Sequence, residues 1–383
     1  MFDIAAFRGR LEAKLPRMLQ LLEKLVNIDS GSYFKPGVDE VGNVMAAELG
    51  ELGFSIERRP LANRGDQVIA TKKLGGHGRL LILGHADTVW PEGTVKDWPY
   101  SRNHDRATGP GVGDMKGGLV MALFALRQLF EDGFDRLGQI RFFLVPDEEL
   151  GSVGSRIQIE EAARDADWTL VLEPGRPGGA VVTARGAVGA LFMHARGQTA
   201  HCAVNYHKGA SAVRELCLKV PILERLAEPD KGLVVNVGVF RGGNARQVVP
   251  GTAEIHIDLR APTQDDAQRL LSEIQRICAD GCDSRIEVKL SGQLTRPAFS
   301  RDKSEPLYRI ATEIAGQLKI ALPELSTAGG SDGNFAAALG IPTLDGLGPV
   351  CHDVCAHGES IEISSLVTRG ALFGSIIDRL RLK

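Results

Sequence analysis

The chain has 383 residues, of which 43% are hydrophobic, and this length is enough for two domains with sizeable cores. Lys and Arg number 45 against 48 Asp and Glu, so the formal net charge is -3, and no long basic run occurs. Neither nucleic acid nor a membrane surface is therefore an expected partner. The first residues lack the apolar core of a secretory signal, and no apolar stretch approaches a membrane span, so we expect a cytoplasmic protein.

The hydrophobic pattern predicts alternating helices and strands over the first part of the chain. Leucines and a methionine recur every three or four residues before Asn27, which predicts an N-terminal helix that ends there. The Gly-rich segment LGGHGR, at 74–79, has the composition of a hairpin turn. The further predicted segments are helices 38–52 and 117–130 and strands 55–60, 67–72, 79–84, 139–145 and 168–172. This alternation indicates an α/β layer architecture.

After residue 183 the pattern becomes that of a half-exposed sheet. In TAEIHIDLR, Ala253, Ile255, Ile257 and Leu259 fall on one face and polar residues on the other, as in an antiparallel sheet covered on one side. The companion segments are the strands VGALFMHARGQ, GLVVNVGVF and RIEVKL, the helices 209–227 and 264–279, and then helix 305–318, strand 341–346 and a C-terminal helix. We expect a second α+β domain over 184–297, inserted into a discontinuous first domain of 1–183 and 298–383.

Acids and a histidine follow the predicted strands of the first domain. His85-Ala86-Asp87 comes after RLLILG, Glu148 and Glu149 come after QIRFFLVPD, and Glu173 comes after DWTLVL. Asp114 lies in the Gly-rich loop TGPGVGDMKGG. Because strand ends line the ligand crevice of an open α/β sheet, we expect these ligands to converge from four strand ends. The pattern predicts a carboxylate-rich metal site suited to hydrolysis.

The spacing of these residues suggests separate roles. An Asp two residues after a metal-binding His can accept the proton of its distal ring nitrogen, so Asp87 is expected to orient His85. Adjacent side chains diverge, so Glu149 can coordinate a metal while Glu148 acts as general base toward the attacking water. Two metals about 3.5–4 Å apart would lower the pKa of that water and polarise the scissile carbonyl.

Two other interpretations of these segments fit less well. The loop GPGVGD opens a helix and could hold phosphate, but no Walker Lys-Ser/Thr pair follows it and Asp114 would face the phosphate. The late segment VCHDVCAHGE could be a Cys/His zinc site, but such sites have shorter knuckles and a second matching half. Six cysteines are also too few for a disulfide framework in this chain, so reduced thiols around one functional histidine are expected.

Seven motifs occur in the order and spacing of the M20 family of metallopeptidases, which the chain resembles from about residue 20 to its C-terminus. The motifs are GHADTV, GPGVGDMKGG, PDEELGS, LEPG, GQTAHCAVNYHKGA, GGSDGNF and CAHGE. Within the family the resemblance is greatest to the glutamate carboxypeptidases. It implies a two-metal peptidase domain, with a mixed sheet between helices, and an inserted α+β lid domain through which two subunits form a homodimer.

The resemblance also implies a ligand set for two Zn²⁺ per subunit, with Co²⁺ or Mn²⁺ as substitutes. His85 and Glu173 would hold one metal, Glu149 and His357 the other, and Asp114 would bridge them. His352 is the alternative to His357, because both lie in a stretch of unusual spacing. Asp87 and Glu148 match the orienting carboxylate and the general base of the family, and the peptide between Asp114 and Met115 is expected to be cis.

The substrate contacts are implied in the same way. His201 resembles the lid histidine that reaches the partner subunit's site and stabilises the tetrahedral oxyanion. Arg296, in TRPAF, resembles the arginine that binds the α-carboxylate of the substrate. The remaining expected contacts are Arg260, Gln247, Gly329, Gly330 and Ser331. Gln247 departs from the family, which usually has Asn there, and the lid segment HCAVNYHKGA departs from the usual pattern.

The acid at position 173 favours one branch of the family. Glu173 resembles the carboxypeptidase-like and deacylase-like members, whereas aminopeptidase-like members commonly have Asp there. The sequence thus predicts a dinuclear metal-dependent hydrolase that cleaves the amide bond to a C-terminal amino acid, with glutamate as the first candidate, in small peptides or N-acyl amino acids. An N-acyl-amino-acid deacylase and a catalytically silent dimeric scaffold are the alternatives.

Overall fold

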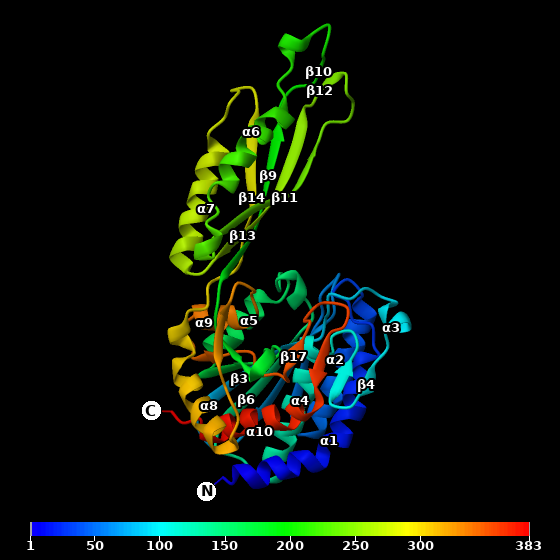
Figure 1. The fold of residues 1–383 in the computed structure, drawn as a ribbon, viewed down its shortest axis with the longest axis vertical. Coiled ribbons are helices and arrows are strands. Elements are labelled where there is room, and N and C mark those ends of the chain that lie inside the picture. The colour runs from blue at the N-terminus through cyan, green and yellow to red at the C-terminus, as the bar shows by residue number, and fades with distance from the viewer. Residues whose placement is uncertain (1, 383) are drawn as a thin grey trace. The chain divides into compact units, whose positions relative to one another are not determined.

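The structure is a computed structural model, and it describes residues 2–382. The chain divides into two compact units (Figure 1). The larger unit comprises Met1–Ala184, Ser300–Ser326 and Ser331–Lys383, and the smaller comprises Arg185–Phe299 together with Thr327–Gly330. Among the described residues, no helix is both long enough and apolar enough to cross a membrane.

The larger unit is built on a six-stranded mixed sheet, which confirms the predicted α/β class. Its strand order is β1-β2-β6-β3-β7-β16. The strands are β1 (Ser55–Arg59), β2 (Gln67–Lys73), β6 (Gln139–Val145), β3 (Arg79–His85), β7 (Trp168–Val171) and β16 (Thr343–Leu344). β1, β2 and β6 pair antiparallel, whereas β6, β3, β7 and β16 run parallel. The parallel half therefore presents the ends of β6, β3 and β7 at one edge.

The predicted hairpin at LGGHGR is wrong, because β6 lies between β2 and β3. The backbone of these glycines instead forms hydrogen bonds with residues 137 and 138, directly before β6. The Gly76 amide donates to the carbonyl of Leu137 at 3.0 Å, and the Gly138 amide donates to the carbonyl of Gly78 at 2.8 Å. A Cβ at Gly76 would lie 1.9 Å from the carbonyl oxygen of Arg136, so this close approach requires glycine.

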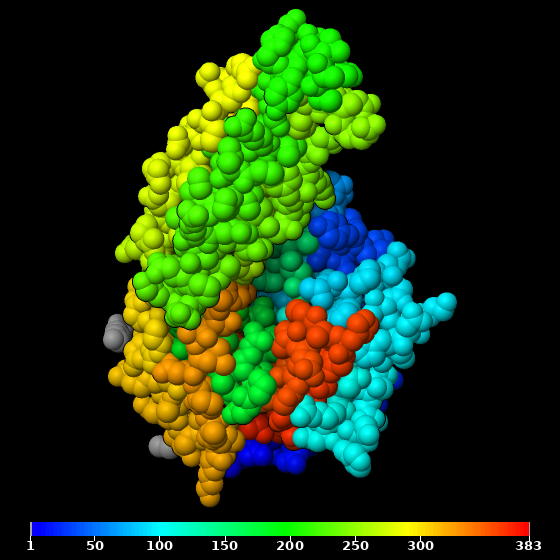
Figure 2. Space-filling view, turned by 45° about the horizontal axis from the view of Figure 1, so that its top comes forward, coloured from blue at the N-terminus to red at the C-terminus, as the bar shows by residue number. Residues whose placement is uncertain are grey.

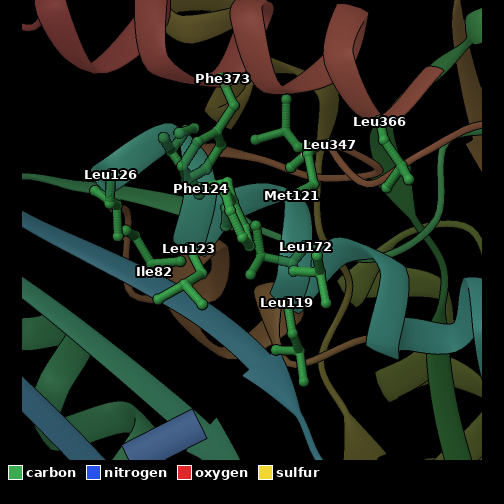
Figure 3. Packing of buried hydrophobic residues seen from close by; sticks show 14 of the residues in the cluster. Ile82, Leu119, Met121, Leu123, Phe124, Leu126, Leu172, Leu347, Leu366 and Phe373 are labelled. Carbon is green, nitrogen blue, oxygen red and sulfur yellow. The ribbon is translucent and has the colours of Figure 1, made fainter. Parts of the chain in front are cut away.

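Helices cover both faces of this sheet because β3 is apolar on both sides. Leu80 and Ile82 join the larger core, and Leu81 and Leu83 join the core on the opposite face. The helices on the first side are α1 (Ile4–Val26), α2 (Lys35–Glu51), α4 (Gly118–Glu131), α8 (Glu305–Leu318) and α10 (Ile363–Arg379), and those on the second are α5 (Arg156–Arg164) and α9 (Gly333–Ala338). Figure 3 shows α4 packed against α10 and β3. α4 is buried almost all round, which fits its apolar sequence.

The smaller unit is a four-stranded antiparallel sheet covered by helices. Its order is β11-β13-β9-β14. Its main elements are β9 (Ala187–Arg196), α6 (Ala212–Glu224), β11 (Val234–Gly242), β13 (Thr252–Ala261), α7 (Gln264–Ala279) and β14 (Glu287–Arg296). The alternation predicted in TAEIHIDLR is confirmed, since Ala253, Ile255, Ile257 and Leu259 are all buried. Two short strands, β10 (Ala200–His201) and β12 (Val248–Val249), form a separate antiparallel pair.

Several short elements complete the larger unit. A small antiparallel sheet has the order β17-β18-β5-β4 and joins the middle of the sequence to its C-terminal part. Its strands are β4 (Ser101–Asn103), β5 (Arg106–Thr108), β17 (Cys351–His352) and β18 (Ser360–Glu362), and β8 (Val181–Arg185) pairs with β15 (Glu324–Thr327) elsewhere. In Figure 2 the C-terminal segment, in orange-red, lies against the cyan segment that contains β4. This places residues 351–362 beside the region that follows β3.

The sheet core makes a testable prediction about stability. Replacing the fully buried Ile82 with Ala should lower the free energy of unfolding by about 2–5 kcal/mol, because the cavity left in a packed core is not refilled. Urea unfolding followed by tryptophan fluorescence measures this unit selectively, since Trp90, Trp98 and Trp168 all belong to it. Ile157 is 66% exposed, so Ile157→Ala is the matched control and should change stability by no more than about 0.5 kcal/mol. Equal effects of the two variants would contradict the described core.

Candidate metal centre

The sheet topology gathers three of the predicted ligand segments at one edge. His85 is the last residue of β3, and the neighbouring parallel strands β6 and β7 end at Val145 and Val171. Glu148 and Glu149 lie in a short 3-10 turn, η2 (Glu148–Leu150), after β6, and Glu173 follows β7. The expectation of four strand ends is wrong for Asp114, which lies in an irregular helical turn, η1 (Val112–Gly117), directly before α4. The peptide between Asp114 and Met115 is cis, as expected.

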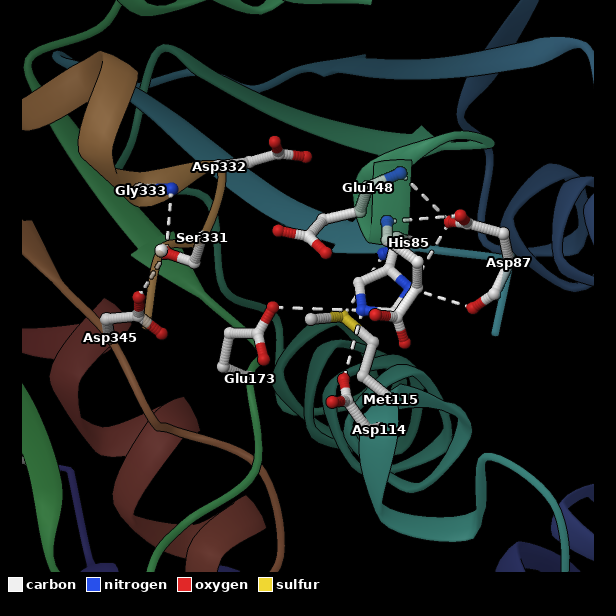
Figure 4. Close-up of polar contacts among 12 residues, drawn as sticks. His85, Asp87, Asp114, Met115, Glu148, Glu173, Ser331, Asp332, Gly333 and Asp345 are labelled. Atoms are coloured by element: carbon white, nitrogen blue, oxygen red, sulfur yellow. Dashed lines mark hydrogen bonds and ion pairs between the residues drawn. The ribbon is translucent and has the colours of Figure 1, made fainter. Parts of the chain in front are cut away.

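His85 is held so that one ring nitrogen faces the carboxylates (Figure 4). Nδ1 lies 2.9 Å from the backbone carbonyl of Asp87. A carbonyl can only accept, so Nδ1 carries a proton, and in the neutral ring, the form that binds a metal, the lone pair is on Nε2. Nε2 lies 3.1 Å from Oδ1 of Asp114 and 3.7 Å from Oε1 of Glu173. The imidazole, which is 1% exposed, therefore presents a metal-binding nitrogen to two acids.

Asp87 differs from its predicted role in one respect. Its carboxylate is 3.5 Å from Nδ1 of His85, farther than its own backbone carbonyl, so the carbonyl is the closer partner of the ring. The carboxylate instead accepts the backbone N–H groups of Glu148 at 3.1 Å and Glu149 at 3.2 Å, and the hydroxyl of Ser32 at 2.7 Å. Asp87 thus ties the end of β3 to the turn that follows β6. Sequence reasoning missed this function because the partners are 61 and 62 residues away.

The acids form two overlapping groups around His85. Ligand atoms of His85, Glu148 and Glu173 lie within 4.8 Å of one another, and so do those of His85, Asp114 and Glu149. Both glutamates of η2 therefore reach the cluster. Glu173 is 6% exposed, and Oε1 of Glu149 is buried without a hydrogen-bond partner. Such a buried, unpartnered carboxylate oxygen is costly unless a cation binds it.

Electrostatics also favours a bound cation. Burial disfavours a charge on His85, but its hydrogen bonds with Asp114 and Asp87 prevail and hold the pKa of the imidazole well above its usual value. Burial, together with the charge of Asp114, raises the pKa of Glu149 well above its usual range. Ligand atoms about 2.0–2.2 Å from a zinc ion lie about 3–3.5 Å apart, and the distances around Nε2 of His85 are close to this. The donor set of one imidazole and several carboxylates therefore fits divalent metal.

Glu359 is a residue of this site that sequence reasoning did not assign, although it lies in the motif CAHGE. Its side chain is completely buried, and Oε1 accepts the backbone N–H groups of Gly113 at 2.8 Å and Asp114 at 3.0 Å. Burial, reinforced by the charge of Asp114, raises the pKa of Glu359 to about 7. Glu359 thereby fixes the backbone of the η1 turn that presents Asp114.

The loop between β17 and β18 brings a thiol, and not a histidine, to the cluster. Sγ of Cys355 donates to Oδ2 of Asp114 at 3.3 Å. His357 is exposed, and its ring packs on Trp90 and Trp98, with centroids 4.8 and 5.3 Å apart. His352 lies 2.9 Å from Oε1 of Glu362. Within residues 2–382, neither histidine is among the groups of ligand atoms described above.

Residues predicted to contact the substrate lie in two places. In the smaller unit, His201 pairs with Val248 in the β10–β12 ladder, and the carbonyl of Gln247 accepts the amide of Cys202 at 3.0 Å, so His201 and Gln247 are neighbours. Both side chains are exposed. In the larger unit, Ser331 is buried, and its hydroxyl donates to Oδ2 of Asp345 at 2.5 Å (Figure 4).

The two predicted arginines of the smaller unit have different surroundings. The guanidinium of Arg260 binds both carboxylate oxygens of Asp258, at 2.8 and 3.1 Å. Arg296 ends β14 and is buried, and its Cγ lies 2.8 Å from where a Cβ of Gly330 would be. The carbonyls of Gly329 and Gly330 both accept from Arg185 at 3.1 Å. Arg296, Gly329 and Gly330 are therefore brought together, and Arg185 is an anchor that the sequence did not reveal.

This geometry, a buried histidine and acids at the ends of parallel strands, defines a metal-dependent hydrolase site of the α/β class. Residues 81–379 match the family described as Peptidase family M20/M25/M40. The chain is 31% identical over 367 residues to carboxypeptidase G2 of Pseudomonas sp. (strain RS-16), covering 92% of this chain and 87% of that protein. The chain belongs to the M20 family of metallopeptidases, as the sequence motifs indicated.

Other relatives have different activities. The chain is 28% identical over 362 residues to a succinyl-diaminopimelate desuccinylase of Xylella fastidiosa (strain 9a5c), covering 88% of this chain and 92% of that protein. Among solved structures, aminopeptidase PepT from Bacillus cereus ATCC 10987 superposes with a TM-score of 0.76 at 23% identity, over 95% of this chain and 98% of that one. The M20 family metallo-carboxypeptidase Sso-CP2 from Sulfolobus solfataricus has a TM-score of 0.73 at 18% identity, over 95% and 99%. These structures share the fold.

The contacts of Asp87 generate a prediction about metal affinity. Asp87→Ala removes the acceptor of two backbone N–H groups in η2, so metal affinity should fall by about 10–100-fold, as is typical when a group that positions metal ligands is lost. Ser32→Ala removes one hydrogen bond to the same carboxylate and should cause a smaller loss. Competition of the metal-free protein with a chromophoric chelator measures both affinities. Unchanged affinity in Asp87→Ala would contradict this role.

Proposed function

We propose that the protein is a dinuclear metal-dependent hydrolase that cleaves the amide bond to a C-terminal amino acid, with glutamate as the first candidate. The observation that carries this proposal is the convergence of His85, Asp114, Glu148, Glu149 and Glu173 into two groups of ligand atoms. The 31% identity to carboxypeptidase G2 supports the carboxypeptidase branch.

We assign the metal ligands as two overlapping sets. His85 and Glu173 would hold one Zn²⁺, Glu149 and His357 would hold the other, and Asp114 would serve both; Co²⁺ or Mn²⁺ could replace zinc. For this role His357 would have to leave its contacts with Trp90 and Trp98. When bound, a pair of divalent metals lowers the pKa of an attacking water and polarises the scissile carbonyl. The carboxylate of Asp114 supports the bridging role, because Oδ1 faces His85 and Oδ2 faces Cys355.

Glu148 performs the proton transfers in this proposal. Its carboxylate takes a proton from water as the water oxygen bonds to the carbonyl carbon, and it returns the proton to the amine as the C–N bond breaks. Asp87 positions this base, since it accepts the backbone N–H of Glu148. The same turn places Glu149 where it would hold a metal, because its own backbone N–H donates to the second oxygen of Asp87.

The activity is tested with one acyl group joined to glutamate, aspartate, leucine or lysine. The wild-type protein should hydrolyse the glutamate substrate fastest, and Glu148→Gln should lower kcat by about 10²–10⁴-fold without loss of bound metal, because only proton transfer is removed. Initial rates and metal content per chain are measured on the same preparations. A broad or apolar preference would favour the second candidate, an N-acyl-amino-acid deacylase, which the identity to desuccinylases suggests. If the protein hydrolysed none of these substrates in the presence of metal, the remaining candidate would be a catalytically silent dimeric scaffold.

The ligand assignment of His357 predicts a loss of one metal. His357→Ala should bind about one metal per chain where the wild-type protein binds two, whereas His352→Ala and Cys355→Ala should retain both. Metal per chain is measured by mass spectrometry after dialysis against metal. The His352 variant is the matched control, because His352 is paired with Glu362. If Cys355→Ala lost a metal and His357→Ala did not, Cys355 would replace His357 in the assignment.

The smaller unit is proposed as a lid that forms a homodimer and completes the partner's site. His201 would stabilise the oxyanion, Arg296 would bind the substrate carboxylate, and Arg260, Gln247 and the segment Gly329–Ser331 would line that subsite. His201, in β10, and Gln247, in the turn directly before β12, are both exposed, which supports a role toward another molecule. Gln247 is one methylene longer than the Asn usual in the family, which would alter the preferred side chain.

A shared site makes a prediction about mixed dimers. His201→Ala should lower kcat by about 10²–10³-fold through loss of an oxyanion donor, whereas His207→Ala, an exposed histidine of the same loop, should not. Mixing equal amounts of the inactive His201→Ala and Glu148→Gln proteins under subunit exchange should restore about a quarter of wild-type activity. Half of the dimers are then mixed, and each has one intact site. Absence of recovery, with exchange confirmed by labelled subunits, would contradict a composite site.

A further inference from the structure

The segment 351–357 carries cysteines and histidines that can bind a metal, and their side chains have different partners. The rings of His352 and His357 contact residues outside the cluster of acids around His85. The thiol of Cys355 instead donates to Oδ2 of Asp114 at 3.3 Å. Cys355 therefore reaches the cluster without any rearrangement of its loop.

The sulfur of Cys355 and the ring of His85 lie at opposite oxygens of one carboxylate. Oδ1 of Asp114 is 3.1 Å from Nε2 of His85, and Oδ2 accepts from Sγ of Cys355. Zinc binds sulfur at about 2.3 Å and carboxylate oxygen at about 2.0–2.2 Å, so the two donors on one ion lie about 3.4–3.6 Å apart. The observed 3.3 Å between Sγ and Oδ2 is close to this separation. One ion could therefore bind both atoms.

The acid of η2 that belongs to this part of the cluster lacks a partner. Oε1 of Glu149 is buried and has no hydrogen bond among the described residues, although ligand atoms of Glu149, Asp114 and His85 lie within 4.8 Å of one another. The negative charges of Asp114 and Glu149 both act on the thiol of Cys355. Two acids and a thiol brought together in this way favour a bound cation.

The backbone of the loop holds the thiol in this position. Asp353 and Cys355 both have left-handed conformations, with φ of 52° and 58°, which non-glycine residues seldom adopt. Such conformations are costly, and they persist where the surrounding structure determines them, often at ligand sites. Cys355 is also an exposed residue, so an ion can approach it from solvent.

We infer that Cys355 is a sulfur ligand of the second metal, the ion assigned to Glu149 and Asp114, and that it makes this position prefer soft ions. This inference rests on the proposed function, because it adds a donor to that pair of metals. The sulfur–metal bond forms as the S–H bond breaks, and the proton passes to solvent. Thiolate favours Zn²⁺ and Cd²⁺, whereas carboxylates suit harder ions such as Mn²⁺.

The remaining donors determine what a variant can show. Without the thiol, Glu149, Asp114 and His357 would still hold the second ion when metal is in excess. The number of metals per chain is therefore the same with and without Cys355 under those conditions. The identity of the donor must be measured from a spectrum or from the preference among metals.

Cobalt reports a sulfur donor directly. The full-length protein saturated with Co²⁺ should have a near-ultraviolet charge-transfer band from thiolate to cobalt, and Cys355→Ser should abolish the band without loss of bound cobalt. Cys217→Ala, at an exposed thiol in α6 of the smaller unit, is the matched control and should keep the band. Cys351→Ala should keep it too, because the thiol of Cys351 donates to the carbonyl of His352 at 3.5 Å. Absence of the band in the wild-type protein, or its persistence in Cys355→Ser, would overturn the inference.

Metal preference gives an independent readout. Chelator competition measures the affinity of the second position for Cd²⁺ and for Mn²⁺, and Cys355→Ser should lower the ratio of the two affinities by at least about tenfold. An unchanged ratio would contradict a sulfur ligand. X-ray absorption of the zinc-loaded wild-type protein needs no variant and should show sulfur at about 2.3 Å from zinc. A shell of nitrogen and oxygen alone would also overturn the inference.

These measurements separate the sulfur ligand from the proposed function. If the cobalt protein has the charge-transfer band but no amide is hydrolysed, the proposed function fails and the ligand assignment of Cys355 is supported. If amides are hydrolysed and the band is absent, the ligand assignment fails and the proposed function is unaffected.

Discussion

The repulsion among the acids at the end of β3 is the constraint on which the site depends. Asp87, Asp114, Glu148, Glu149 and Glu173 surround a single imidazole in a buried region, and like charges brought out of water oppose one another. Backbone N–H groups stabilise Asp87 and a further buried acid, Glu359, with two donors to each carboxylate. Bound cations would offset this repulsion. The geometry and the charge of the cluster therefore both support a metal-dependent function.

The elements of the fold could be predicted from sequence because their signals are local. The run RLLILG and the alternation in TAEIHIDLR determine which residues are buried in β3 and β13, and both agree with the structure. The order of strands was not accessible in the same way. β6 begins 54 residues after the end of β3, yet it lies between β2 and β3 in the sheet. Packing between segments distant in sequence determines this position, and the glycines of LGGHGR do not.

The same distinction holds for the candidate site. Pairs close in sequence, such as His85 with Asp87 or Glu148 with Glu149, carried a readable signal. The loop between β17 and β18 did not, because Asp353 and Cys355 adopt left-handed backbone conformations, with φ of 52° and 58°, which non-glycine residues seldom adopt and which no sequence pattern here indicates. Tertiary contacts therefore decide where Cys355, His357 and Glu359 point. The cavity beside Glu149 could not be predicted from sequence either, since three separate segments line it: residues 31–34, 88–92 and 149–150.

The first and last helices of the chain share one core, and this sets the order in which the protein can be assembled during synthesis. The ring of Phe7, in α1, lies so close to Gly374, in α10, that a Cβ there would be 2.6 Å from it. The larger unit thus remains open until the ribosome has released the C-terminal helix, whereas most of the smaller unit, Arg185–Phe299, is continuous and is translated earlier. The incomplete larger unit must therefore be protected from aggregation during the time in which the smaller unit is already folded and attached to it.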